Sequence, residues 1–330
     1  MVYTGFALSF LNHFRRLFAG LICLSLFGTA LGVAADSPSM LTMAIARLTG
    51  SIPSGPPRAL TGSEFAKYVA RMDPRQREQA ILGQILAGNL PGFLRNLVPV
   101  RFTFEASQGK TVNATIFAMP EYLAIGTDKD FLRIPMNLYT AAAVAKKLGF
   151  VLPTRKIVDA IYAQAAFHFS PQPMTAGPQM RSTEYYVIHN EKVQSQSRAL
   201  GVTPGLLVSG DKKDVVLSNR LERNPGKIAI YGWHRLDGAP IQPLSTIHGA
   251  CYADYSHGIR LVSETMLVDG EPRSVYDVLQ DPALAGILSD EGPIPNLQNL
   301  ISRTAGEQPC RTTQTTLDNP LANIPRLPFF

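Results

Sequence analysis

The sequence predicts an α+β fold in which a helical N-terminal half packs on a mostly antiparallel β-sheet. Before residue 200, long segments carry apolar residues at helical spacing. After residue 200, short β-rich segments alternate with turn residues. The sequence shows no internal repeat, so we expect a single domain over 61–330, helix-rich in 61–200 and β-rich in 201–290.

The first 35 residues have the pattern of an export signal. Arg15 and Arg16 precede an uncharged apolar run over 17–33, and small residues at 33–35 form a cleavage site. The run is also about long enough to remain as an anchor, because a spanning helix needs roughly 20 residues. We expect cleavage and a periplasmic or secreted protein with no later membrane span.

Between the signal and the domain, residues 36–60 are rich in Ser, Pro and Gly and predict a flexible linker, with a short helix possible over 41–48. In the helix-rich part, Thr61 or Ser63 caps a first helix and Asp73-Pro74 opens a second. The complete set comprises helices over 61–69, 74–87, 139–148, 154–166 and 182–200, a hairpin joining 97–106 to 111–118, a short strand at 122–126 and a loop over 171–179.

The β-rich part consists of short Val- and Ile-containing runs. We expect strands at 206–208, 214–217, 227–231, 259–262 and 265–268, then short helices at 275–279 and 283–288. The Pro- and Thr-rich tail, 308–330, is expected to be loose.

Charge and cysteine content narrow the class of protein. The formal net charge of +6 is mild and its cations are scattered, so nucleic-acid binding is not expected. After removal of the signal only Cys251 and Cys310 remain. In an oxidising compartment they can form a disulfide, and the alternative is that Cys251 is a free thiol, either buried or reactive.

The candidate functional centre is the segment 247–261. Together with the preceding Trp233-His234 it holds three of the six histidines and the only tryptophan. The chemistry-bearing residues of the segment are His248, Cys251, Asp254, Tyr255, His257 and Arg260. Such side chains carry protons, ligate metals and stabilise anions near neutral pH.

One interpretation is metal-free acid–base catalysis. His248 and His257 would exchange protons, Asp254 would orient a histidine, and Arg260 would contact substrate or a developing oxyanion. The second is a zinc site formed by His234, His248 and His257, or by two histidines and Asp254, although the sequence has neither an HExxH motif nor a CxxC pair. The third is that these side chains only hold the loop through hydrogen bonds to backbone carbonyls.

Four residues are candidates for substrate binding. Lys213 lies in the charged turn 210–214, where a lysine can hold a carboxylate or phosphate, and His189 lies on the polar part of a helix. Trp233 and Tyr255 provide aromatic surface that can stack on a sugar ring.

The pairs Ile247-His248-Gly249 and Ser256-His257-Gly258, followed by Ile259-Arg260-Leu261, resemble the signature of the L,D-transpeptidases of bacterial cell walls. In that family a cysteine follows the Ser-His-Gly triplet, attacks a peptidoglycan peptide and is activated by the histidine. Here Ile259 occupies that position, so the resemblance would require Cys251 to act instead. The resemblance covers about fifteen residues and implies a cell-wall enzyme.

From these observations the sequence predicts an exported hydrolase that acts on an envelope or extracellular polymer, either a peptidoglycan peptide or a polysaccharide. It needs no cofactor, or zinc if the histidines form a metal site. The alternative from another class is a non-catalytic envelope-binding module that uses exposed Trp233, Tyr252 and Tyr255.

Overall fold

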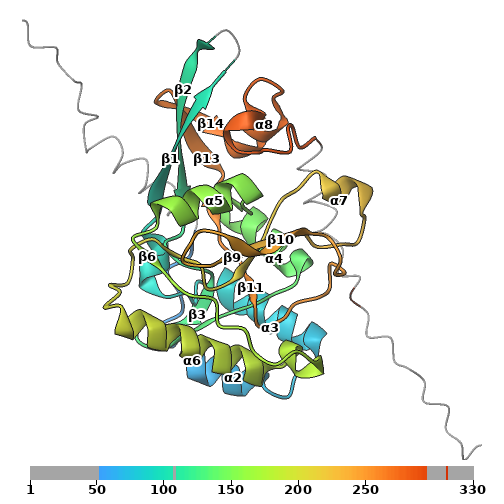
Figure 1. The fold of residues 1–330 in the computed structure, drawn as a ribbon. Coiled ribbons are helices and arrows are strands. Elements are labelled where there is room, and N and C mark those ends of the chain that lie inside the picture. The colour runs from blue at the N-terminus through green and yellow to red at the C-terminus, as the bar shows by residue number, and fades with distance from the viewer. Residues whose placement is uncertain (1–51, 107–108, 296–309, 311–330) are drawn as a thin grey trace, which may run out of the picture.

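The computed structural model describes residues 52–106, 109–295 and 310, and it has a mixed α+β architecture (Figure 1). The predicted signal peptide, the 41–48 helix, most of the linker and all of the 308–330 tail except Cys310 lie outside the described residues. Within the described residues, no helix is long and apolar enough to cross a membrane.

The predicted helices are present, with local capping signals at their N-termini. In α2 (Gly62–Val69) and α3 (Pro74–Leu86), the capping residues Thr61 and Asp73 each form a reciprocal capping box. The long helix α6 (Thr183–Ala199) begins after Ser182, whose hydroxyl accepts from a backbone N–H. The other predicted helices are α4 (Leu138–Leu148), α5 (Arg155–Gln164) and α8 (Val275–Gln280), while the helix expected at 283–288 is the 3-10 turn η4 (Ala285–Ile287). The short helix α7 (Arg220–Arg223) and the 3-10 turns η1 (Gly92–Arg95) and η3 (Pro178–Arg181) were not expected.

The largest sheet combines strands from both halves of the chain. The predicted hairpin is confirmed as β1 (Val98–Glu105) and β2 (Thr111–Ala118), paired in register from Val98↔Ala118 to Glu105↔Thr111. The other strands are β5 (Phe150–Val151), β12 (Val262–Ser263), β13 (Thr265–Val268) and β14 (Glu271–Ser274), in the order β14-β13-β2-β12-β5. Because β2 lies between strands from beyond residue 260, the helix-rich and β-rich parts are interwoven.

A second sheet carries the candidate site. Its order is β10-β9-β8-β11, and it consists of β8 (Lys213–Val215), β9 (Ile230–His234), β10 (Pro240–Ser245) and β11 (His257–Gly258). Two small pairs complete the strands: β3 (Ala124–Gly126) with β4 (Phe131–Arg133), and β6 (Phe167–His168) with β7 (Val208–Ser209). In Figure 1 the β9–β11 region lies between the projecting β1–β2 hairpin and the α2–α6 end.

Three expectations differ from the structure. The end of the predicted linker packs on the domain, because Ile52 is buried and the Arg95 guanidinium donates to the carbonyls of Ile52 and Pro53. Of the strand expected at 259–262 only Val262 lies in a strand, β12, while β11 ends just before the expected segment. Strands β4, β5, β6, β10 and β14 were not expected, and most of them are too short to show an alternating pattern.

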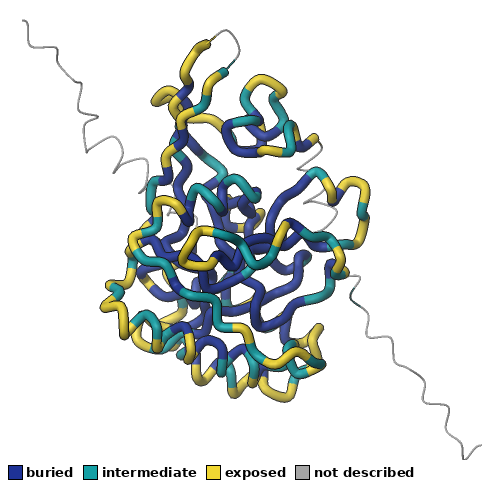
Figure 2. The backbone as a smooth tube through the Cα atoms, viewed as in Figure 1, coloured by how far each residue is buried: buried dark blue, intermediate teal, exposed yellow. Residues whose placement is uncertain are grey.

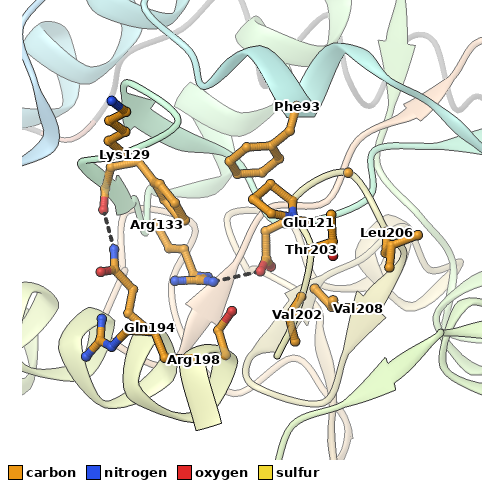
Figure 3. Close-up of a pocket in the computed structure, with 14 residues that line it drawn as sticks. Phe93, Glu121, Lys129, Arg133, Gln194, Arg198, Val202, Thr203, Leu206 and Val208 are labelled. Carbon is orange, nitrogen blue, oxygen red and sulfur yellow. Dashed lines mark hydrogen bonds and ion pairs between the residues drawn. The ribbon is translucent and has the colours of Figure 1, made fainter. Parts of the chain in front are cut away.

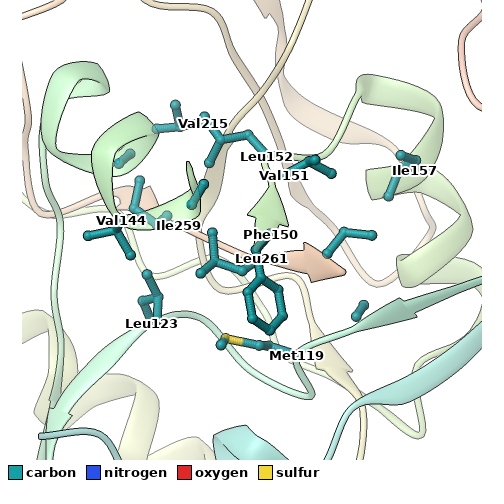
Figure 4. Packing of buried hydrophobic residues seen from close by; sticks show 14 of the residues in the cluster. Met119, Leu123, Val144, Phe150, Val151, Leu152, Ile157, Val215, Ile259 and Leu261 are labelled. Atoms are coloured by element: carbon teal, nitrogen blue, oxygen red, sulfur yellow. The ribbon is translucent and has the colours of Figure 1, made fainter. Parts of the chain in front are cut away.

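The core is continuous through the centre of the molecule, where the chain is buried in Figure 2, while turns and the outer side of α6 are exposed. Figure 4 shows Met119, Leu123, Phe150 and Leu261 meeting there with Ile259. The residues that follow the Ser-His-Gly triplet are therefore core residues.

Candidate functional site

Strand pairing places His257 and Lys213 together in the second sheet. β11 runs parallel to β8 with His257 opposite Lys213 and Gly258 opposite Asp214, while Lys213 also faces Gly232 of β9. Directly paired residues project to the same face of a sheet and successive residues alternate. His257 and Lys213 therefore share one face, and Asp214 lies on the other.

Asp254 is a buried carboxylate that accepts three hydrogen bonds. The Ser256 backbone N–H and hydroxyl donate to Oδ1 at 2.7 and 2.6 Å, and the Tyr252 hydroxyl donates to Oδ2 at 2.9 Å. Burial alone would raise the pKa of Asp254, but the nearby His257 and these hydrogen bonds hold it below its ordinary value. Asp254 is therefore ionised at neutral pH.

His257 is buried, and neither of its ring nitrogens hydrogen-bonds to a described residue. Burial lowers the pKa of His257 to about 4, with Asp254 opposing this effect and Lys213 adding to it. At pH 7 the imidazole is neutral and has a lone pair available. Such a group accepts a proton once a reacting group reaches it.

A stacked aromatic pair lies next to His257. The rings of His248 and Tyr252 are parallel, 4.2 Å apart between centroids, and lie 6.5 and 5.7 Å from the His257 ring. Both residues are half-buried, so they form the solvent side of the cluster. The structure thus brings together three predicted residues, His248, Asp254 and His257, with Tyr252 connecting them.

Lys213 and Trp233 form the adjoining part of the cluster. Lys213 Nζ lies 5.1 Å from the centroid of the Trp233 ring, and burial lowers the pKa of this half-buried lysine. Trp233 is only 4% exposed, adopts a positive φ of 56°, and its indole N–H has no partner among the described residues. The expectation that Trp233 offers an open stacking surface is therefore wrong, since the side chain is buried and the Lys213 ammonium lies over its ring.

Tyr255 and His189 are also buried, and they pack beneath the loop that carries Asp254. The Tyr255 hydroxyl accepts from the Met174 N–H at 2.7 Å, while its carbonyl accepts from Lys212 Nζ at 2.6 Å. The same ammonium lies 3.0 Å from His189 Nδ1. These contacts fix the loop that carries Asp254, so direct substrate contact by Tyr255 and His189, as expected from the sequence, is not possible in this conformation. An open aromatic face formed by Trp233 and Tyr255 is not present either.

Arg260 lies away from this cluster. Its buried guanidinium donates to the carbonyls of Met119 at 3.0 Å and Val208 at 2.8 Å, and it lies over the Tyr122 ring at 4.3 Å. Tyr122 packs against Gly258, which belongs to the face opposite His257. The expected role of Arg260 as an oxyanion contact is corrected to a structural one, because its donors serve the backbone.

Cys251 is bonded to Cys310, which settles the alternatives left open by the sequence. A disulfide sulfur is not a thiolate, so Cys251 does not act as a nucleophile in this state. Ile259, in the position where the transpeptidase signature has cysteine, is fully buried in the core. The chain therefore places no free thiol beside His257 among the described residues.

His234 has different neighbours from the other two histidines. Its Nε2 lies 3.0 Å from Asp159 Oδ1, and its ring stacks on Tyr162 at 4.5 Å. The predicted set of His234, His248 and His257 is thus not assembled. In the part of the chain that the structure describes, no group of three or more His, Cys, Asp or Glu side chains is placed to hold a metal ion.

Sequence reasoning missed several polar residues. Lys212 was seen only as part of a charged turn, and the buried residues Glu121, Arg133 and Asp211 were not singled out. The available signal was a charged residue within an apolar run, as in Met119-Pro120-Glu121-Tyr122-Leu123, because such residues are seldom buried unless they are paired.

Comparison with protein-family models, curated proteins and solved structures gives no match to this chain.

Proposed function

We propose that this chain is an exported hydrolase of envelope or extracellular polymers, with His257 as its acid–base residue. The observation that carries the proposal is the environment of His257. It is a neutral imidazole without a hydrogen-bond partner among the described residues, and it adjoins an ionised carboxylate and a lysine. A buried, unpaired polar group lowers stability, which favours a functional reason for its retention.

The arrangement supports metal-free hydrolysis of an amide. His257 takes a proton from water while the water oxygen bonds to the substrate carbonyl carbon. The Lys213 ammonium stabilises the resulting oxyanion, a role for which Arg260 is not available. The carbon–nitrogen bond then breaks, and the imidazolium returns its proton to the leaving nitrogen. Asp254 stabilises the transient imidazolium through its negative charge.

Access to His257 runs past the His248–Tyr252 pair. His257 is 1% exposed, whereas His248 and Tyr252 are half-buried. Substrate binding therefore requires the pair to move by rotation of the two side chains, and Tyr252 would then exchange its bond to Asp254 for one to substrate. Extended polymers fit this location because the site lies beneath the surface loop that carries the half-buried His248 and Tyr252.

The test is hydrolysis of purified peptidoglycan, muropeptides and polysaccharide fragments, followed by mass spectrometry for products that gain one water. We expect His257→Gln and Asp254→Asn to lower the rate by at least about 100-fold, the scale of acid–base catalysis. His168→Gln is the matched control, since this half-buried histidine of β6 hydrogen-bonds through its ring to the carbonyl of Tyr162 in α5. Equal rates for His257→Gln and His168→Gln would overturn the assignment.

The pH profile gives a second readout. Because burial lowers the pKa of His257 to about 4, the base form persists into mildly acidic solution. The rate is expected to fall only below about pH 5, rather than near 6.5 as for an exposed histidine. A decline centred near 6.5 would show that the catalytic base is another group.

A further inference from the structure

A pocket lined by both charged and apolar residues lies apart from the His257 cluster. It has a volume of about 250 Å³, and its lining comes from η1, β4, the C-terminal half of α6 and the segment 202–208 (Figure 3). None of His248, Asp254, His257 and Lys213 contributes to its wall. The proposed hydrolase therefore makes no use of this space.

The floor of the pocket is a buried ion pair. Arg133 Nη2 donates to Glu121 Oε2 at 2.8 Å, and the two side chains are 3% and 6% exposed. Arg133 Nη1 donates to Asn190 Oδ1, while Nε lies 3.7 Å from Asp211 Oδ2 and has no hydrogen-bond partner among the described residues. Burying this many charges is costly even when they are paired, so the cluster is not explained by stability alone.

Two further cations line the pocket at the surface. Lys129 and Arg198 are both exposed, and neither forms an ion pair with a described residue. They lie on one side of the Glu121–Arg133 pair in Figure 3. An anion at the mouth would therefore meet uncompensated positive charge, whereas the Glu121 carboxylate would repel an anion that went deeper.

The opposite side of the pocket is apolar. Val202, Leu206 and Val208 lie there in Figure 3, and Leu206 is 44% exposed although it is a large hydrophobic residue. Phe93 and Phe131 also line the pocket, with ring centroids 5.2 Å apart, and the Phe131 ring lies 5.0 Å from the Arg133 guanidinium. A ligand with an apolar body would bury this surface, which is favourable by roughly 25 cal/mol per Å².

From this division of charge and hydrophobicity we infer that the pocket binds a small monocarboxylate with an apolar body. The carboxylate lies at the mouth, on the side of Lys129 and Arg198, and the apolar part packs on Leu206 and Phe93. A free organic acid and the C-terminus of a peptide that ends in an apolar residue share this chemistry. A dianion is disfavoured because the Glu121 carboxyl group lies at the floor of the pocket, beside Arg133.

Binding can be measured by calorimetry or by NMR titration of the full chain. The probes are phenylacetate for a free acid and acetyl-Ala-Ala-Phe for a peptide C-terminus, each compared with its amide. We expect the acid to bind at least about 5-fold tighter than its amide, and the probe with the lower Kd identifies the source. Equal binding of acid and amide, or no binding of either acid at 10 mM, which is about the weakest affinity such an assay follows, would overturn the inference.

Variants assign the contact. Lys129→Gln and Arg198→Gln should each raise the Kd for the acid by about 2- to 5-fold and leave that for the amide unchanged. Arg75→Gln, an exposed arginine on α3, is the matched control and should change neither. All three positions are exposed, so the fold is expected to persist, which circular dichroism checks. If Arg75→Gln weakened binding of the acid as much as Arg198→Gln does, the effect would come from the net charge of the protein, and the proposed site would be refuted.

Discussion

Replacement of His257 by glutamine should change how stability depends on pH. The folded state lowers the pKa of His257 from 6.5 to about 4, because the imidazolium is disfavoured when it is buried. Because the pKa of this histidine is lower in the folded state, its contribution to stability is complete above pH 6.5. That contribution is lost as the pH falls from 6.5 toward 4. Between pH 7 and pH 5 the unfolded chain gains a proton that the folded chain does not, which costs about 2 kcal/mol from this residue. Glutamine does not titrate and removes that loss.

The measurement is urea unfolding of both proteins at pH 7 and at pH 5, analysed as free energies of unfolding. Other buried groups also titrate: burial raises the pKa of Glu78 and Asp211 to about 7 and of Asp214 to about 6, so these three favour the folded state as the pH falls. These three groups are present in both proteins. Their effect therefore cancels when the change in unfolding free energy between pH 7 and pH 5 is compared between wild type and variant. The wild type should lose about 2 kcal/mol more than His257→Gln on going to pH 5. A difference below about 0.5 kcal/mol would show that His257 is not held neutral and therefore is not poised as a base.

Three further changes test the remaining structural reasoning. Gly258→Ala should cost about 1–3 kcal/mol, because the added Cβ would lie 2.6 Å from the Tyr122 ring, and the loss is read from urea unfolding. Cys251→Ser should cost about 2–4 kcal/mol, and adding Cys310→Ser to it should cost little more because the bridge is already absent. Arg260→Met should lower the melting temperature strongly, because it leaves two buried carbonyls without donors, instead of giving a folded, inactive protein.

The glycine and arginine predictions each have a clear contradicting result. Gly83→Ala is the control for Gly258→Ala, since nothing lies within 4 Å of its added Cβ and it should be neutral or slightly stabilising. Equal effects of the two glycine variants would contradict the packing argument. Full activity loss in a stable Arg260→Met protein would return Arg260 to the catalytic machinery.

Local signals in the sequence were sufficient for the helices and the long hairpin. Thr61 and Asp73 cap helices through contacts within three residues, and the β1–β2 hairpin pairs neighbouring segments. Short strands depend on partners far along the chain, as when Val262 pairs with both Ala118 and Val151. A two-residue strand carries no periodicity of its own, so its location comes from tertiary packing.

The candidate site was predicted in part for the same reason. Asp254 and His257 are three residues apart, and a tight loop brings them together through Ser256. The separation of His257 from Arg260 follows from tertiary packing, since the Arg260 guanidinium donates hydrogen bonds to the Met119 and Val208 carbonyls. No spacing rule shows that Lys213 lies opposite His257, because this depends on parallel pairing of strands more than 40 residues apart.

The Cys251–Cys310 bond has a consequence for handling the protein. The two cysteines are separated by 59 positions, so they close a covalent ring within the chain. A single protease cut anywhere inside that ring adds the mass of one water but releases no fragment, and the molecule still migrates as one species until a reductant is added. Samples judged intact on a non-reducing gel can therefore already be nicked, and only a reduced sample or an exact mass distinguishes the two forms.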